Sequence, residues 1–567
     1  MGDDGRTRGL ANGLTNYGDP AFSAYLRRSF ASSMGYSRDL LARPVVGIAH
    51  SASGFNNCHR LVPELIEAVK RGVLAAGALP LDFPTISLGE GFLTPTSLKF
   101  RNLMSMDVEE MIRAQPMDAV VLIGGCDKTV PAQVMGAISA GRPAIQLVTG
   151  PMATAMHRGE RLGACTDCRR FWARFRAGEI DEAEIDRVER RLASTAGTCA
   201  VMGTASTMAS LVEAMGLMLP MGASIPAVDA DRLRLAEATG AAAVALIGSG
   251  RPMAELVTQE SLENALRVLL AIGGSTNAVL HMAAIAGRAG LELDLRRFNE
   301  LSETTPVIVD LKPTGTHYMQ DLHAAGGLPA VMRELGDLLH LGVPTVTGET
   351  LGERLAAADP WVDRTVIRPI DDPIHPKGGL VALFGSLAPK GAVLKRSAAD
   401  PRLFEHEGRA VVFDGLEDLA ARIDDPDLDV TADALLVLKN AGPTSPAAMP
   451  EAGYLPIPKK LARAGVKDML RLSDARMSGT AYGTIVLHIA PDAAAGGPLA
   501  LVETGDRISL SVERCRLDLL VEPDELARRR QALPPPPPLP ARGHDRLYQE
   551  QILQADEGCD FGFLKGS

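Results

Sequence analysis

Short runs of β-branched residues alternate with helical patterns over the first two-thirds of the chain. Residues 44–49 form one such run and predict a buried strand, and apolar positions at helical spacing predict an amphipathic helix over residues 61–76. Strand–helix–strand spacing of this kind is typical of a parallel sheet covered by helices. The other elements predicted here are strands over residues 119–123, 144–148 and 306–310 and a helix over residues 131–140.

The pattern changes after about residue 370, where strand-like segments become short and closely spaced. We therefore predict an α/β fold with two domains: a parallel-sheet α/β/α domain over residues 1–375, and a smaller β-barrel-like domain over residues 376–567. A proline run at 534–538 predicts an extended strap, and helical periodicity returns in the tail from residue 547. The strands predicted in the second domain cover residues 380–384, 410–413, 434–439, 469–472, 484–489 and 508–521.

Composition narrows the class of protein. The 567 residues carry a formal net charge of −11 and no basic stripe with interleaved aromatics, which argues against a nucleic-acid partner. No segment approaches the roughly 18 apolar residues of a membrane span, and residues 1–6 lack the apolar region of a secretory signal, so we expect a cytoplasmic protein. The seven cysteines are odd in number and widely spread, which indicates reduced thiols rather than a disulfide framework.

Three cysteines lie in turn-rich segments suited to a metal centre. Cys126 follows a predicted buried strand and a glycine pair, Cys58 follows Gly54-Phe-Asn-Asn57, and Cys199 lies in a run of small residues. The loops of Cys58 and Cys126 leave strand C-termini, where ligands collect in parallel sheets. Three converging thiols would hold an iron–sulfur cluster and leave one iron open to bind a substrate oxygen.

Hard ligands lie beside these soft ones. Asp127 follows Cys126 directly, and its carboxylate suits Mg²⁺ as the thiolate suits iron. A carboxylate at the position of Glu90 is more often solvated, but the glycine on either side also suits a close approach of a ligand. Lys128 would ordinarily be an exposed partner of an acid, but between metals its amine could lose its proton and take up carbon dioxide as a carbamate. The sequence therefore predicts a paired metal centre at this loop.

The remaining candidates are a serine turn and the other cysteines. Ser478 is flanked by small residues, but Arg476 stands where a hydrolase elbow needs its first glycine, so an alkoxide base is the sharper hypothesis. Cys165 and Cys168 form a Cys-x-x-Cys pair, which suits a redox pair or half of a zinc site, and no second pair completes such a site. Cys515, in an alternating strand, and Cys559 are interpreted as small buried hydrophobes.

Taken together, these segments resemble the dihydroxy-acid dehydratase and phosphogluconate dehydratase superfamily. The resemblance covers nearly the whole chain. Its motifs are Gly125-Cys-Asp-Lys-Thr-Val-Pro131, Gly197-Thr-Cys199, Gly273-Gly-Ser-Thr-Asn-Ala278, Asp310-Leu-Lys-Pro313, Ala325-Gly-Gly-Leu-Pro329, Gly385-Ser-Leu-Ala-Pro389, Met449-Pro-Glu451 and Ser473-Asp-Ala-Arg-Met-Ser-Gly-Thr480.

The resemblance implies a role for each candidate residue. It implies that Ser478 is the catalytic base and that Thr480 lies close to the substrate. It also implies an α/β domain followed by a barrel-like domain, with the site between them in a homodimer or homotetramer. The metal ligands that it implies are Cys58, Cys126 and Cys199 for the iron–sulfur cluster, and Glu90, Asp127, Lys128 (as a carbamate) and Glu451 for Mg²⁺.

The serine segment separates the branches of the superfamily. Asp474-Ala-Arg-Met-Ser-Gly-Thr480 looks like the sugar-acid (aldonate) dehydratases, which typically carry a [2Fe–2S] cluster rather than a [4Fe–4S] cluster. The expected reaction turns a 2,3-dihydroxy sugar acid into its 2-keto-3-deoxy acid. Asn57, Leu61 and Gly562 depart from the family pattern, which bears on substrate size and identity. The alternatives are a dihydroxy-acid dehydratase of branched-chain amino-acid synthesis and a non-catalytic iron–sulfur sensor or redox protein.

Overall fold

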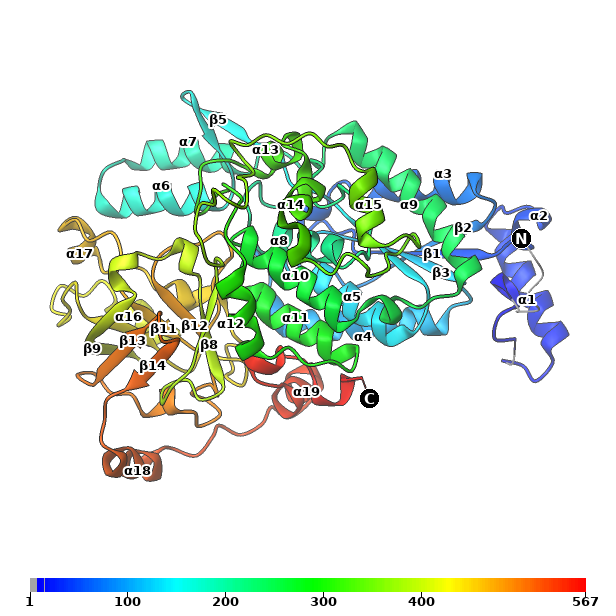
Figure 1. The fold of residues 1–567 in the computed structure, drawn as a ribbon. Helices are drawn as coiled ribbons and strands as arrows, with labels where there is room; N and C mark the ends of the chain where they lie inside the picture. Colours follow the sequence, from blue (N-terminus) through cyan, green and yellow to red (C-terminus); the bar gives the residue numbers. More distant parts are fainter. Residues whose placement is uncertain (1–7, 15, 567) are drawn as a thin grey trace.

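The computed structural model describes residues 8–14 and 16–566; the first six residues, where we expect no secretory signal, lie outside this part. Figure 1 shows a helix-rich body with a parallel sheet and, beside it, a strand-rich body. The helices are α1 (Pro20–Ser33), α2 (Arg38–Leu41), α3 (Val62–Ala75), α4 (Arg101–Ala114), α5 (Thr129–Ala140), α6 (Thr166–Ala177), α7 (Glu182–Leu192), α8 (Thr204–Ala214), α9 (Ala230–Ser249), α10 (Gln259–Ala271), α11 (Asn277–Arg288), α12 (Leu295–Thr304), α13 (Met319–Ala324), α14 (Gly327–Leu335), α15 (Leu351–Ala357), α16 (Leu416–Arg422), α17 (Lys459–Arg463), α18 (Pro523–Ala532) and α19 (Gly543–Gln551).

The first sheet is parallel, with strand order β2-β1-β3-β4. Helices α3 and α9 pack on one face and α4 and α5 on the other (Figure 1), which covers the apolar side chains of the central strands. Strand β3 is buried along its whole length because both of its faces carry a helix layer. The strands of this sheet are β1 (Val45–His50), β2 (Leu79–Pro84), β3 (Ala119–Gly124) and β4 (Ala144–Val148).

The second sheet has eight strands in the order β14-β13-β9-β10-β11-β12-β8-β7. Its edges approach one another, since Phe384 donates to Cys515 O and accepts from Leu517 N, so the sheet is a nearly closed barrel. Alternate residues of β9 pack inside the barrel and against α16 outside it. The strands are β7 (Val381–Leu383), β8 (Gly391–Leu394), β9 (Glu405–Phe413), β10 (Leu435–Leu438), β11 (Arg471–Ser473), β12 (Ile485–Ala490), β13 (Arg507–Ser511) and β14 (Arg516–Leu519), and a separate small hairpin pairs β5 (Ala155–His157) with β6 (Glu160–Leu162).

These observations confirm the predicted α/β class, with a parallel sheet followed by a barrel-like sheet. Two strand predictions were wrong. Residues 306–310 lie outside both sheets, because Val307 and Val309 form only isolated bridges to His375 and Ile367. Residues 508–521 form the hairpin β13–β14 rather than one strand, and Cys515 lies in its turn with φ +53°.

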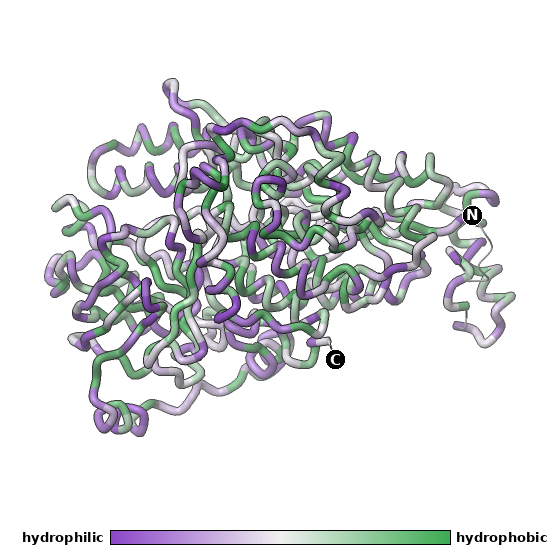
Figure 2. Tube along the Cα trace, in the orientation of Figure 1, coloured by the Kyte–Doolittle hydropathy of each residue, from purple (hydrophilic) through white to green (hydrophobic). Residues whose placement is uncertain are grey.

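The segment after the barrel returns to the first body. Helix α18 has no buried residue and is strongly hydrophilic (Figure 2), and the proline run after it belongs to no helix or strand. Helix α19 then docks: Tyr548 is buried against Phe561 and Ala448, and Asp545 lies 2.7 Å from the Lys99 amine. The tail therefore ties the two bodies together.

Candidate active site

The loops that follow β1 and β3 lie side by side at the point where the parallel sheet changes direction. β1 connects to β2 through α3, whereas β3 connects to β4 on the other side through α5. Loops that diverge in this way leave a crevice at the strand C-termini. Cys58 follows β1 and Cys126 follows β3, so the predicted placement of both at strand ends is confirmed.

His59 joins these two loops. Its Nδ1 lies 2.7 Å from Ser51 O, and its Nε2 lies 3.0 Å from Gly125 N and 3.3 Å from Cys126 N. Since the two backbone N–H groups must donate to Nε2, Nδ1 carries the proton and the ring is neutral. Burial lowers the pKa of His59 to about 4, which keeps it in this state. The sequence analysis did not single out His59, although it adjoins a predicted ligand.

The three predicted thiols lie in two neighbouring pairs, one of which includes a fourth cysteine. Cys58 lies beside Cys126, and the Cys165 and Cys199 sulfurs are 3.3 Å apart. Cys199 is also close enough to Cys58 for their charges to interact. The hydrogen bond from Cys58 to Cys126, and then burial, raise the pKa of Cys58 well above its usual range, and the bond to Cys165 does the same for Cys199. Sulfur donors in such a group suit an iron–sulfur cluster.

Three carboxylates from distant segments form a second group. Glu90 follows β2, Asp127 follows β3, and Glu451 lies in the barrel-like body after β10. One oxygen of each lies within 4.8 Å of the others. A hard divalent cation such as Mg²⁺ prefers oxygen donors of this kind, so the set fits the predicted magnesium site.

Two buried cations contact these carboxylates. Lys128 Nζ lies 3.1 Å from Glu90 and 3.5 Å from Asp127. Arg476 donates to Glu451 at 2.7 Å and to Glu90 at 2.8 Å. Burial alone would raise the pKa of Glu90, but the charges of Arg476 and Lys128 outweigh it and hold the pKa well below its usual range. Burial, and then the charge of Glu90, raise the pKa of Glu451.

Arg476 is a second residue of this region that was not predicted from the sequence to take part in the site. In the sequence, Arg476 was used only to exclude a hydrolase elbow. In the structure its side chain is fully buried and also donates to Thr96 Oγ1 and Met449 O. It therefore crosslinks Glu90 of the first body and Glu451 of the second. Its place in the same short segment as Ser478 was the available signal.

The serine segment packs between the two bodies. Ser478 Oγ lies 2.8 Å from Thr480 Oγ1 and 3.4 Å from Thr480 N. The segment packs closely against Ser275 because residue 479 is a glycine: a Cβ there would lie 2.6 Å from the Ser275 side chain. Thr166, next to Cys165, donates to Thr480 O at 3.1 Å. Ser478 and Thr480 are thus adjacent, and the backbone of Thr480 is bonded to the residue that follows Cys165.

Lys395 is a buried amine behind this segment, with Nζ 3.4 Å from Gly479 O. Burial lowers its pKa from 10.5 to about 7. Below pH 7 the amine is charged in the folded state as well, and burying that charge lowers the free energy of unfolding. Between pH 7 and 10.5 the amine is neutral in the folded state and charged in the unfolded state, so this destabilisation becomes smaller as the pH rises. We expect Lys395→Met to raise the free energy of unfolding by about 1–3 kcal/mol at pH 7 and by less near pH 10, measured by urea unfolding. An equal gain at both pH values would contradict this.

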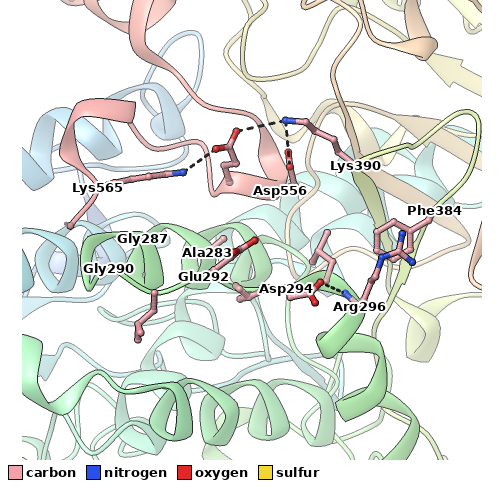
Figure 3. Close-up of a pocket in the computed structure, with 15 residues that line it drawn as sticks. Ala283, Gly287, Gly290, Glu292, Asp294, Arg296, Phe384, Lys390, Asp556 and Lys565 are labelled. Carbon is pink, nitrogen blue, oxygen red and sulfur yellow. Dashed lines mark hydrogen bonds and ion pairs between the residues drawn. The ribbon is translucent and has the colours of Figure 1, made fainter.

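A surface cavity of about 530 Å³ lies elsewhere, between α11 and the C-terminal tail (Figure 3). Its lysines lie near acidic residues of the C-terminal tail: Lys565 lies 2.9 Å from Glu557, and Lys390 lies 3.9 Å from Asp556. None of the candidate site residues lines it. Cavity volume alone therefore does not locate the chemistry of this protein.

Known proteins match the chain over most of its length. Residues 43–354 match the dihydroxy-acid/6-phosphogluconate dehydratase N-terminal family and residues 365–559 the corresponding C-terminal family. The chain is 45% identical to a 6-deoxy-6-sulfo-D-gluconate dehydratase of Pseudomonas putida (96% of this chain, 94% of that protein). It is 44% identical to an L-arabinonate dehydratase of Rhizobium leguminosarum bv. trifolii (97% and 95%). A dihydroxy-acid dehydratase of Carboxydothermus hydrogenoformans is 39% identical (94% and 97%).

The chain therefore belongs to the dihydroxy-acid/6-phosphogluconate dehydratase family. This confirms the resemblance inferred from the sequence motifs and the enzyme class, since members of this family are dehydratases, that is, hydro-lyases. Within the described residues, no helix combines the length and apolar character needed to cross a membrane.

Proposed function

We propose that this protein removes water from a sugar acid, turning an aldonate into its 2-keto-3-deoxy acid. The observation that carries the proposal is the meeting of Glu90, Asp127 and Glu451 within 4.8 Å, in a loop system that also gathers the thiols of Cys58, Cys126 and Cys199. A redox carrier needs sulfur donors but has no use for the carboxylate group. Removal of a hydroxyl from a 2,3-dihydroxy acid uses both the sulfur donors and the carboxylate group.

The serine segment and the relatives support the sugar-acid branch. Asp474–Thr480 has the sequence typical of aldonate dehydratases. The relatives named for sulfogluconate and arabinonate are 45% and 44% identical, against 39% for the relative named for dihydroxy acids. The proposed substrate is therefore a small polyhydroxy carboxylate rather than a branched-chain dihydroxy acid.

In the proposed reaction, Ser478 Oγ takes the proton from C2 of the substrate. The Thr480 hydroxyl and backbone N–H both face Ser478 Oγ and would donate to it once it is an alkoxide. The carboxylates of Glu90, Asp127 and Glu451 would hold the metal that orients the substrate. When bound, Mg²⁺ and the iron–sulfur cluster supply Lewis-acid stabilisation at the C2 side and at the departing C3 hydroxyl.

The finer assignments belong to the same proposal. We assign Cys58, Cys126 and Cys199 to a [2Fe–2S] cluster, and Lys128, as a carbamate, to the magnesium set. The buried Lys128 amine lies within 3.5 Å of two carboxylates, so conversion to a carbamate would turn a bound cation into another oxygen ligand. We further propose a cytoplasmic homodimer or homotetramer with a domain boundary at residues 375/376.

A substrate screen tests the proposal. Anaerobically reconstituted enzyme with Mg²⁺ is mixed with five- and six-carbon aldonates, and the 2-keto acid formed is quantified. We expect turnover of at least one aldonate in preference to 2,3-dihydroxyisovalerate. The opposite preference would favour the branched-chain enzyme. Reversible one-electron cycling without 2-keto acid from any substrate would favour an iron–sulfur redox protein.

A further inference from the structure

Cys165 is a thiol that the proposed function does not use. Its sulfur lies 3.3 Å from that of Cys199, whereas the Cys-x-x-Cys spacing predicts a pairing with Cys168. Cys165 and Cys199 are both half-buried residues, whereas Cys126 is buried. The contact therefore joins an assigned cluster ligand to a second thiol outside the assigned set.

The structure fixes Cys165 in this place. Asp167, two residues further on, is buried and accepts hydrogen bonds from Gly163 N at 2.8 Å, Tyr318 Oη at 3.0 Å and Lys312 Nζ at 3.0 Å. These bonds hold the start of α6 against the segment that contains Lys312 and Tyr318.

The loop of Cys199 is tied to the same segment. Met202 N donates to Lys312 O, and Met319 N donates to Ala200 O, both at 2.9 Å. Cys165 and Cys199 are therefore held on one common support. A disulfide has a sulfur–sulfur distance of about 2.05 Å, so bond formation needs an approach of only about 1.3 Å.

We propose that Cys165 is a resolving thiol, which forms a reversible disulfide with Cys199 when an oxidant strips the cluster from its ligands. With hydrogen peroxide as the oxidant, a thiolate of the pair attacks the peroxide oxygen, giving a sulfenic acid and releasing one water after protonation. The other thiol then attacks that sulfur and the second water leaves. The two sulfurs lose two electrons, and the peroxide is reduced to two waters.

The bridge would protect the site while blocking it. In the bridged state Cys199 cannot bind iron, but its sulfur also cannot proceed to the irreversible sulfinic acid. A thiol reductant would return both thiols, and the cluster could then be rebuilt. The inference does not depend on the substrate assignment, because the bridge is detected without turnover.

The test uses the full-length protein, isolated without oxygen, treated with hydrogen peroxide and then with an alkylating reagent. Cluster absorption is followed during treatment, and protease fragments are identified by mass spectrometry. We expect a fragment that links Cys165 to Cys199, formed as the absorption is lost and removed by dithiothreitol. After reduction and addition of iron and sulfide, the absorption should return.

Two variants separate this role from a general effect of losing a thiol. Cys165→Ser should form no such link, should accumulate sulfinic acid at Cys199, and should recover several-fold less cluster after reduction. Cys168→Ser, three residues away, should behave like the parent chain. Alkylated, unlinked Cys165 in the oxidised parent, or a link only between Cys58 and Cys126, would overturn the proposal, even if the substrate screen succeeds.

Discussion

Ser478→Ala is expected to lower kcat by about 10²–10⁴-fold while leaving the cluster absorption unchanged, because a general base contributes that much to a proton transfer. Among the hydrogen bonds of the described residues, those of Ser478 Oγ go to Thr480 and to none of the metal-ligand candidates. Removal of its hydroxyl should therefore spare the thiol and carboxylate groups. The measurements are 2-keto acid formation at saturating aldonate, the visible spectrum and the magnesium content.

Ser509→Ala is the matched control. Ser509 lies on β13, where it pairs with Glu407 of β9 on one side and with Asp518 of β14 on the other. These neighbours are not among the candidate site residues. This variant should keep the parent kcat. Turnover by Ser478→Ala within a few-fold of the parent would remove the assigned base. Loss of the cluster in that variant would show a structural role instead.

The parts of the fold that were predicted correctly are those whose local sequence decides their structure. The runs that form β1, β3 and β4 are β-branched and flanked by helical patterns. Strand β2 was missed because Pro80 and Pro84 interrupt its pattern, and it tolerates them as an edge strand. The run at 306–310 is buried without lying in a sheet, and an apolar run does not distinguish these two situations.

The site shows the same division. The sequence already shows the combination of Cys126, Asp127 and Lys128, because these residues are adjacent. Their roles remain predictions. The approach of Cys165 to Cys199 was not visible, because it depends on how α6 docks against the Lys312 segment. The contacts of Arg476 with Glu90 depend on the docking of the barrel against the first body. Contacts between segments hundreds of residues apart leave no local pattern.

Arg476→Gln is expected to make the stability of the protein depend on magnesium. In the structure, the carboxylates of Glu90, Asp127 and Glu451 face the cations Arg476 and Lys128. Loss of the guanidinium leaves Glu451 without its ion-pair partner and Glu90 with Lys128 as its remaining cation, so the repulsion between the two carboxylates is less well compensated. Removing one partner of a buried ion pair costs about 3–5 kcal/mol, and we expect the lower end because the two carboxylate side chains keep 25% and 22% exposure.

Magnesium should reverse much of this loss, because a divalent cation between the carboxylates replaces the missing charge, and a ligand that binds only the folded state stabilises it. Arg471→Gln is the matched control. Arg471 is also buried and lies 2.7 Å from Asp468, but within the described residues it forms no hydrogen bond or ion pair with a candidate metal ligand. Thermal unfolding with and without Mg²⁺ should show a larger magnesium-induced rise in Tm for Arg476→Gln than for the parent or for Arg471→Gln. Equal rises in all three proteins would mean that Arg476 does not act as the counter-ion of a magnesium site, and no rise in any of them would remove the assigned role of the carboxylate group.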